Sequence, residues 1–248
     1  MKIGLLNAYH FDGVPDGYQS QYRVLFEGYF RRICPRDWHF ELYEVAQNQF
    51  PASLEACDGW VIGGSGKSCY EDEAWIARLS DWVQACFRAK RKLCGICFGH
   101  QLIAQALGGQ VQRSDRGWGV GVRTFQFIHS PPWHTADAAA PPSWMQHCSL
   151  IFSHQDQVTA LPAGATRYAT DAFCPIQSFG VDRRVFTLQG HPEITAAFAR
   201  ERLRARQALM AAHTVERAWA SLDQAVHDDE VGDLIVRFFE APISESDA

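Results

Sequence analysis

The sequence predicts an α/β fold in which helices cover both faces of a mostly parallel sheet, with a small antiparallel β portion and C-terminal helices. The chain has 248 residues, of which 47% are hydrophobic and 21% charged, so it can bury a sizeable core. Apolar runs of strand length alternate with amphipathic helical stripes in the first half of the chain. In sheets built this way, functional groups gather at the carboxyl ends of the strands.

The apolar runs and stripes define the elements of the first half in order. Strands are expected at residues 3–7, 40–45, 59–62 and 93–96. Helices are expected from the stripe Tyr22, Leu25, Phe26, Tyr29, Phe30 and Ile33, from the stripe Trp75, Leu79, Trp82 and Cys86, and at residues 102–107. A Gly/Asp/Pro loop at 12–17 precedes the first helix, and the acidic residues 71–73 suit the positive end of the second. This order is typical of a flavodoxin-like sheet.

The second half of the chain changes character. Residues 111–185 contain short β-like runs between turns such as Ser130-Pro131-Pro132 and Ala140-Pro141-Pro142, which predicts antiparallel or edge strands. Helical patterns return at residues 196–212 and in the stripe Val231, Leu234, Ile235, Phe238 and Phe239. We expect a single domain over residues 1–248, with about 195–248 as a helical extension packed on it. The arginines at 200, 202, 204 and 206 could dock an acidic partner, but a solvated basic face is the favoured interpretation.

The net charge argues against nucleic acid and anionic membranes as partners, and the cysteine pattern argues against a disulfide-stabilised fold. The net charge of −5 and pI near 6.0 provide no basic footprint for nucleic acid or an anionic membrane. The eight cysteines are scattered, which indicates reduced thiols rather than a disulfide framework. The first residues do not resemble a signal peptide, and no apolar run is long enough to span a bilayer. We therefore expect a cytoplasmic protein whose partners are small molecules or proteins.

One cysteine has an unusual setting. Cys97 stands between a predicted strand and a predicted helix, with Gly95 and Gly99 two residues to either side. In a G-x-C-x-G turn the small residues relieve crowding around a strained nucleophile, and a helix N-terminus favours its thiolate. The N–H of Phe98 can point at a developing oxyanion. Taken alone, a cysteine is more often a small buried hydrophobe.

A candidate base and its orienting acid lie in Gln189-Gly190-His191-Pro192-Glu193. A residue before proline is biased toward extended backbone, where residues two apart project to the same side. Glu193 can therefore fix the tautomer of His191, which takes a proton from Cys97 and returns it to a leaving group. The preceding apolar run at 185–188 would deliver His191 to the sheet edge that carries Cys97.

Four blocks of the sequence together resemble the class I glutamine amidotransferase family. The blocks are Gly63-Gly64-Ser65 with residues 70–76, then 97–101, 153–158 and 189–193. Their order of nucleophile, histidine and acid also agrees with the family, whereas an α/β-hydrolase places the acid before the histidine. The residues after the two glycines, 66–68, depart from the family pattern, so the oxyanion loop is expected to differ in shape.

The resemblance implies roles for individual residues and no cofactor. It implies that Cys97 attacks a glutamine side-chain amide to form a γ-glutamyl thioester, with His191 as acid/base and Glu193 as its orienter. The implied oxyanion donors are the N–H groups of Gly64 and Phe98, and the implied substrate-binding residues are Gln101, Ser153 and His154. For His154 by itself, a structural histidine is an equally good interpretation.

Other interpretations fit the sequence less well. The segment 64–68 resembles the end of a phosphate-binding loop, but Val61 occupies the position of the required first glycine. Cys94 and Cys97 form a C-x-x-C pair, yet Cys94 falls inside a predicted strand, so a redox role is the weaker hypothesis. The histidines lack the spacing of a metal site. A binding module with a degenerate site is disfavoured because all three triad residues are present.

Two functions remain within this chemistry. The favoured one is a glutamine amidotransferase that delivers ammonia to a separate synthase or acceptor protein, because little sequence beyond Glu193 is left for an acceptor domain. The alternative is a stand-alone γ-glutamyl peptidase or hydrolase that acts on a γ-glutamyl amide or peptide other than free glutamine. In both cases the substrate is a small γ-glutamyl molecule.

Overall fold

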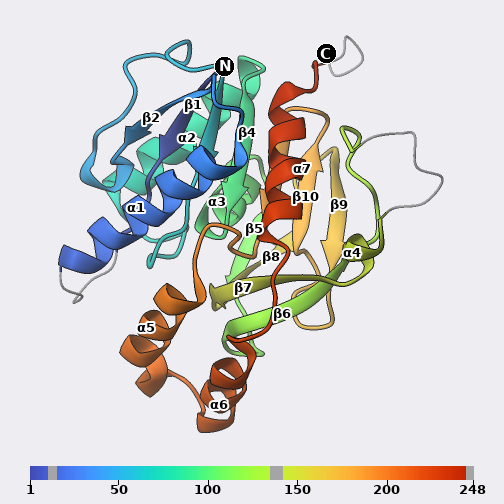
Figure 1. The fold of residues 1–248 in the computed structure, drawn as a ribbon. Coiled ribbons are helices and arrows are strands. Elements are labelled where there is room, and N and C mark those ends of the chain that lie inside the picture. Colours follow the sequence, from blue (N-terminus) through green and yellow to red (C-terminus); the bar gives the residue numbers. More distant parts are fainter. Residues whose placement is uncertain (11–15, 135–141, 244–248) are drawn as a thin grey trace.

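A nine-stranded sheet runs through the protein, whose computed structural model describes residues 1–10, 16–134 and 142–243 (Figure 1). The strands in chain order are β1 (Lys2–Leu6), β2 (His39–Tyr43), β3 (Gly59–Ile62), β4 (Lys92–Ile96), β5 (Gln110–Arg113), β6 (Gly119–Phe127), β7 (Cys148–His154), β8 (Asp156–Ala160), β9 (Ala165–Thr170), β10 (Ser178–Val181) and β11 (Val185–Leu188). The sheet order is β2-β1-β3-β4-β11-β10-β9-β6-β7, and β5 pairs separately with β8. Residues 12–15 of the predicted first loop and 140–141 of a predicted turn lie outside the described residues.

The sheet combines a parallel and an antiparallel half. Strands β2, β1, β3, β4 and β11 pair in parallel; the apolar runs of β1, β3, β4 and β11 are buried on both faces, whereas the edge strand β2 is only half-buried. From β11 outward, the pairs with β10, β9, β6 and β7 are antiparallel. The prediction of a mostly parallel sheet with an antiparallel portion in the second half is therefore confirmed.

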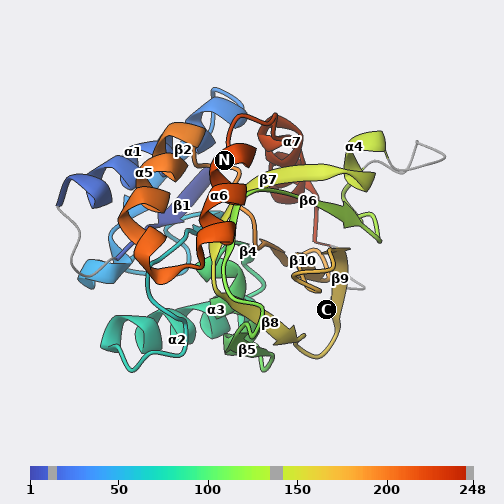
Figure 2. The same ribbon diagram turned by 90° about the horizontal axis from the view of Figure 1, so that it is seen from below.

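Helices cover both faces of the parallel half. The helices are α1 (Asp16–Ile33), α2 (Ala74–Arg88), α3 (Phe98–Ala106), α4 (Ser143–Gln146), α5 (Ala196–Arg206), α6 (Ala212–Ser221) and α7 (Asp228–Glu240) in the described part of the chain. Helices α1 and α7 pack side by side on one face, where Gly232 meets the side chain of Ile33. Helices α2 and α3 bury their apolar residues in a second core on the opposite face. Figure 2 shows α5 and α6 beyond the sheet, next to β6 and β7.

One helix prediction needs correction. The predicted helix 196–212 ends as an α-helix at Arg206, continues as a 3-10 turn at Gln207–Leu209, and a separate helix α6 begins at Ala212. The sequence there is rich in good helix formers throughout, so propensity does not mark the break. The acidic residues 71–73 lie at the positive end of α2 as expected, with Glu73 at its N-cap and Glu71 accepting a hydrogen bond from the N–H of Ser68. Within the described ranges no helix is long and apolar enough to cross a membrane.

Candidate active site

Cys97 sits in the strained turn that its neighbours predict. It follows the last residue of β4 and precedes α3, with φ 53° and ψ −99°. A non-glycine residue rarely adopts this backbone conformation, and such strain gathers at functional sites. A Cβ on Gly95 would lie 2.6 Å from the carbonyl carbon of Gly99, and one on Gly99 would lie 2.3 Å from the carbonyl oxygen of Ile62. Both positions therefore require glycine, and Phe98 provides the first free N–H of the helix.

His191 and Glu193 form a buried pair. Nδ1 of His191 lies 2.7 Å from Oε1 of Glu193, and both side chains are almost completely buried. The strand β11 delivers His191 to this edge of the sheet, and its N–H donates to the carbonyl of Ile151 at 2.8 Å. Burial by itself would lower the pKa of His191, but Glu193 and Cys97 outweigh it and raise the pKa to about 9. The structure therefore brings the three candidate catalytic residues together and favours a protonated imidazole beside Cys97.

The hydroxyl of Tyr22 ties this pair to the loop after β3. It donates to Oε1 of Glu193 at 2.9 Å and accepts from the N–H of Gly64 at 2.8 Å. Burial and the charge of Glu193 raise the pKa of Tyr22 well above its ordinary value, so it remains a neutral donor. The N–H of Gly64 is thus engaged in this structure, and its oxyanion role stays a prediction that requires this bond to open.

Two glutamines connect Cys97 to the neighbouring strand. Nε2 of Gln189 donates to the sulfur of Cys97 at 3.6 Å, and Oε1 of Gln189 accepts from Nε2 of Gln101 at 3.1 Å. Nε2 of Gln101 also donates to the carbonyl of Asp156 at 2.8 Å. Gln101 therefore lines the cavity, but its amide nitrogen is committed to protein partners, and its substrate-binding role stays a prediction. The contact between Gln189 and the sulfur adds a donor that would stabilise a thiolate.

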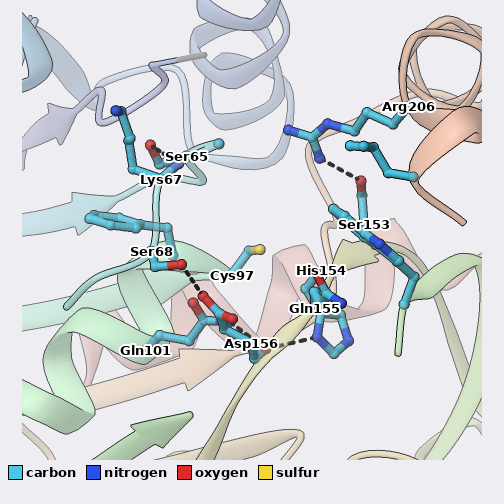
Figure 3. A pocket seen from close by; sticks show the side chains of 14 residues that line it. Ser65, Lys67, Ser68, Cys97, Gln101, Ser153, His154, Gln155, Asp156 and Arg206 are labelled. Carbon is cyan, nitrogen blue, oxygen red and sulfur yellow. Dashed lines mark hydrogen bonds between the residues drawn. The ribbon is translucent and has the colours of Figure 1, made fainter. Parts of the chain in front are cut away.

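A cavity of about 270 Å³ opens in front of Cys97, with the sulfur directed into it (Figure 3). It is lined among others by Cys97, Phe98, Gln101, Ser153, His154 and Arg206. Gly64 is not part of the lining, whereas its neighbours Ser65 and Gly66 are. The predicted nucleophile and predicted substrate-binding residues therefore share one cavity.

His154 has the environment of a packed neutral histidine. Its Nδ1 lies 3.0 Å from the carbonyl of Asp156, and its Nε2 would lie 2.6 Å from a Cβ placed on Gly119. Burial lowers the pKa of His154 to about 3. The side chain of Asp156 meanwhile accepts hydrogen bonds from the hydroxyls of Ser68 and Tyr70, which holds the loop after β3 over the cavity. These contacts favour the structural interpretation of His154 and assign a loop-anchoring role to Asp156.

Arg206 enters the cavity from α5. Its guanidinium donates to Oγ of Ser153 at 3.4 Å (Figure 3). The guanidinium also lies 5.7 Å from the centroid of the Trp118 ring. Arg206 is only 5% exposed, and burial together with the charge of Arg202 lowers its pKa to about 9, so it remains charged at neutral pH.

The expectation of a solvated basic face on this helix is therefore wrong for Arg202 and Arg206, both of which are buried. They occupy the same helical face as Phe198, Ala199 and Leu203, which are also buried. Their spacing relative to these apolar residues was the signal that could have identified them. Arg204, on the other side of the helix, is exposed.

The geometry gives little support to a phosphate-binding loop, a redox-active cysteine pair or a metal site. Lys67 of the phosphate-loop-like segment pairs with Glu73 at 3.0 Å and with Glu71 at 3.4 Å. Cys94 is a buried free cysteine inside β4. Among the described residues, no group of three or more His, Cys, Asp or Glu could hold a metal ion.

The chain is similar in sequence and in fold to several known proteins. A family model described as glutamine amidotransferase class-I matches residues 27–209. The chain is 34% identical to γ-glutamyl peptidase 3 of Arabidopsis thaliana over 159 residues, which make up 62% of each chain. It is 36% identical to a glutamine-hydrolysing GMP synthase of Dehalococcoides mccartyi over 141 residues, which make up 55% of this chain and 23% of that protein. A crystal structure of a glutamine amidotransferase from Thermotoga maritima has the same fold, with a TM-score of 0.70, 18% identity and 96% of both chains covered.

Proposed function

Because the chain belongs to the class I glutamine amidotransferase family, we propose that it is a cysteine-dependent hydrolase of γ-glutamyl compounds. The observation that carries the proposal is the strained turn that directs Cys97 into a cavity beside the buried pair of His191 and Glu193. A thiolate, an acid/base and an orienting carboxylate are the groups that acyl transfer from an amide requires.

The chemistry follows from the positions of these groups. The thiolate of Cys97 attacks the γ-carbonyl carbon of the substrate, and the C–N bond then breaks as the imidazolium of His191 gives its proton to the leaving nitrogen. This step leaves a γ-glutamyl thioester on Cys97 and a free amine or ammonia. A water molecule attacks the thioester, His191 takes one of its protons, and the thiolate leaves as the γ-carboxylic acid forms, which then loses its remaining proton to solvent. Glu193 keeps the ring in the tautomer that both steps need.

The negative charge on the carbonyl oxygen needs donors in each step. Phe98 supplies the N–H at the start of α3, where the helix dipole adds to the stabilisation. Gly64 supplies a second N–H once Tyr22 releases it. Each such donor contributes about 3 kcal/mol to transition-state stabilisation in other acyl-transfer enzymes.

A stand-alone γ-glutamyl hydrolase is better supported than ammonia delivery to an acceptor protein. The relative from Arabidopsis is named as a γ-glutamyl peptidase, although the match spans only 62% of its length. The buried charge of Arg206 also lies in the catalytic cavity, where it can bind a carboxylate of the substrate. We therefore propose that the physiological substrate is a γ-glutamyl amide or peptide and that Arg206 binds one of its carboxylates.

A panel of γ-glutamyl compounds tests the proposal. The purified chain and its Cys97→Ala variant are assayed against free glutamine, γ-glutamyl dipeptides and a γ-glutamyl anilide, with release of glutamate as the readout. We expect faster release from the peptides than from glutamine, and none from the variant. Release from glutamine that stays slow until a second protein is added, with no activity on peptides, would restore the ammonia-delivery hypothesis. Wild-type activity in the Cys97→Ala variant would contradict both the hydrolase and the ammonia-delivery hypotheses.

A further inference from the structure

A second cavity, of about 410 Å³, lies between β6 and α6. Figure 2 shows α6 next to β6, and the hydroxyl of Ser221 accepts a hydrogen bond from the N–H of Val122 at 2.9 Å, which holds the helix on the strand. The cavity is lined among others by Arg116, Trp118, Arg123, Phe173, His213 and Arg217. Trp118 also lines the catalytic cavity, so the two cavities are neighbours.

Arg123 is the most buried cation of this second cavity. It projects from β6, and its guanidinium stacks over the ring of Phe173 at 4.1 Å. Its Nε atom is buried and has no hydrogen-bond partner in the described part of the chain. Burial and the nearby charge of Arg217 lower the pKa of Arg123, while Asp171 raises it. Asp171 lies outside the cavity lining, and its Oδ1 accepts the N–H groups of Phe173 and Cys174.

The other charges around this cavity are also positive. Arg116 and Arg217 bring two further guanidinium groups, and no Asp or Glu lines the cavity. Across residues 1–10, 16–134 and 142–243, no ion pair joins Arg116, Arg123 or Arg217 to a carboxylate. The first turn of α6 contributes His213 and Thr214, and its N-cap residue Ala211 provides no side-chain acceptor. The positive end of this helix therefore adds to the field at the cavity.

We propose that this cavity binds a small multivalent oxyanion, with Arg123 and Arg217 as its principal ligands. A bound anion supplies a counter-charge to arginines that line one cavity and form no ion pair in the described part of the chain, and guanidinium groups bind carboxylate and phosphate oxygens in bidentate pairs. Phosphate esters and polycarboxylates share this chemistry, and the cavity volume suits a molecule of either class. The site is distinct from the catalytic cavity, whose cationic lining residues are Lys67 and Arg206.

Isothermal titration calorimetry on the full chain tests this site. Inorganic phosphate and citrate are titrated at constant ionic strength, with acetate as the monovalent comparison. We expect saturable binding of phosphate, citrate or both, and much weaker binding of acetate. Arg217→Gln is expected to weaken the binding about tenfold, since it removes one charge-assisted contact to an exposed anion. Arg123→Gln should weaken it at least as much.

The controls separate this site from general charge effects and from the catalytic cavity. Arg204→Gln makes the same charge change on an exposed residue outside the cavity and should leave binding unchanged. If Arg123→Gln fails to fold, Arg217→Gln still decides, because Arg217 is an exposed residue of α6. The proposal is overturned if neither phosphate nor citrate binds saturably, or if Arg204→Gln weakens binding as much as Arg217→Gln. It is also overturned if Arg206→Gln abolishes binding while Arg217→Gln leaves it intact.

Discussion

The hydroxyl of Tyr22 donates to Oε1 of Glu193 at 2.9 Å, across 171 residues of sequence. The same hydroxyl accepts the N–H of Gly64, so one phenol group joins the candidate triad acid to the candidate oxyanion loop. Tyr22 is held in place by a stack with Tyr9 at 4.3 Å between ring centroids. Oε2 of Glu193 has no protein partner among the described residues, which leaves Oε1 and its two donors to fix the carboxylate.

Tyr22→Phe should therefore impair catalysis without unfolding the chain. The change removes one of the two donors to Glu193, and this loss is what should lower the rate, because the N–H of Gly64 that it also releases becomes free for the oxyanion role. We expect kcat to fall about tenfold, since a hydrogen bond to a charged group contributes on the order of 1.5 to 3 kcal/mol. Steady-state kinetics over a range of pH measure the effect, and a changed pH profile would distinguish a positioning role from a loss of packing.

Tyr29→Phe is the matched control for this substitution. Tyr29 lies on the same helix, is buried, and donates to the carbonyl of Asp228 at 2.9 Å, away from the catalytic cavity. It should lower the melting temperature and leave kcat and its pH profile unchanged. Similar kinetic losses in both variants would contradict a specific role for Tyr22.

Cys97→Ala should abolish hydrolysis and keep the fold. Alanine retains the strain at φ 53°, whereas Cys97→Gly relieves it, so the glycine variant should be the more stable of the two inactive proteins by about 1 kcal/mol. Thermal unfolding and glutamate release measure both effects. Cys94→Ala removes a buried thiol three residues earlier and should remain active. Lost activity in Cys94→Ala together with retained activity in Cys97→Ala would reassign the nucleophile.

Gly64→Ala should disturb the candidate base directly. A Cβ at this position would lie 2.9 Å from Cε1 of His191, so the ring must move. A displacement of this kind can lower the rate about 100-fold. Gly28→Ala provides the control, because a Cβ there meets nothing within 4 Å and should stabilise α1 by about 0.5 to 1 kcal/mol. Unchanged kinetics in Gly64→Ala would show that the loop and ring adapt freely.

Arg206→Gln should weaken substrate binding more than turnover. If the guanidinium binds a substrate carboxylate equally in the ground and transition states, KM rises about tenfold while kcat changes little. The comparison pairs a γ-glutamyl dipeptide with its C-terminal amide, in wild type and variant, and a smaller effect on the amide would identify which carboxylate is bound. Arg204→Gln, on the exposed side of the same helix, should have wild-type kinetics. A fall confined to kcat would contradict the binding role.

The charge of His191 should depend on both of its neighbours. NMR of the imidazole is expected to give a pKa of about 9, well above the ordinary 6.5, and Cys97→Ala and Glu193→Gln should each lower it. Because the folded pKa is raised, protonated His191 stabilises the fold; this contribution is complete below pH of about 6.5 and is lost as the pH rises through about 9. Chemical unfolding at a series of pH values should show this decline in wild type. It should be smaller in His191→Gln, and an equal decline there would assign it to other groups.

The chain by itself determined the parts of this protein that depend on short-range constraints. The alternation of apolar runs predicted the sheet and its helices, and the glycines around Cys97 predicted the strained turn, because a side chain at Gly95 would collide with the backbone of Gly99 within the same turn. The two-residue spacing of His191 and Glu193 predicted that they would face the same way, because proline biases the preceding backbone toward extension.

Only the tertiary structure decided the contacts between distant segments. In the sequence, Tyr22 is one member of the apolar stripe of the first helix. Nothing in its local sequence indicated that its hydroxyl would join Gly64 to Glu193. The burial of Arg206 depended on where α5 packs against β7, which helix propensity leaves undetermined. Many side chains satisfy a local amphipathic pattern equally well. Packing alone selects which polar atom of a helix meets a partner from another part of the chain, and the hydrogen-bond network around Cys97 is therefore a property of the fold rather than of any one motif.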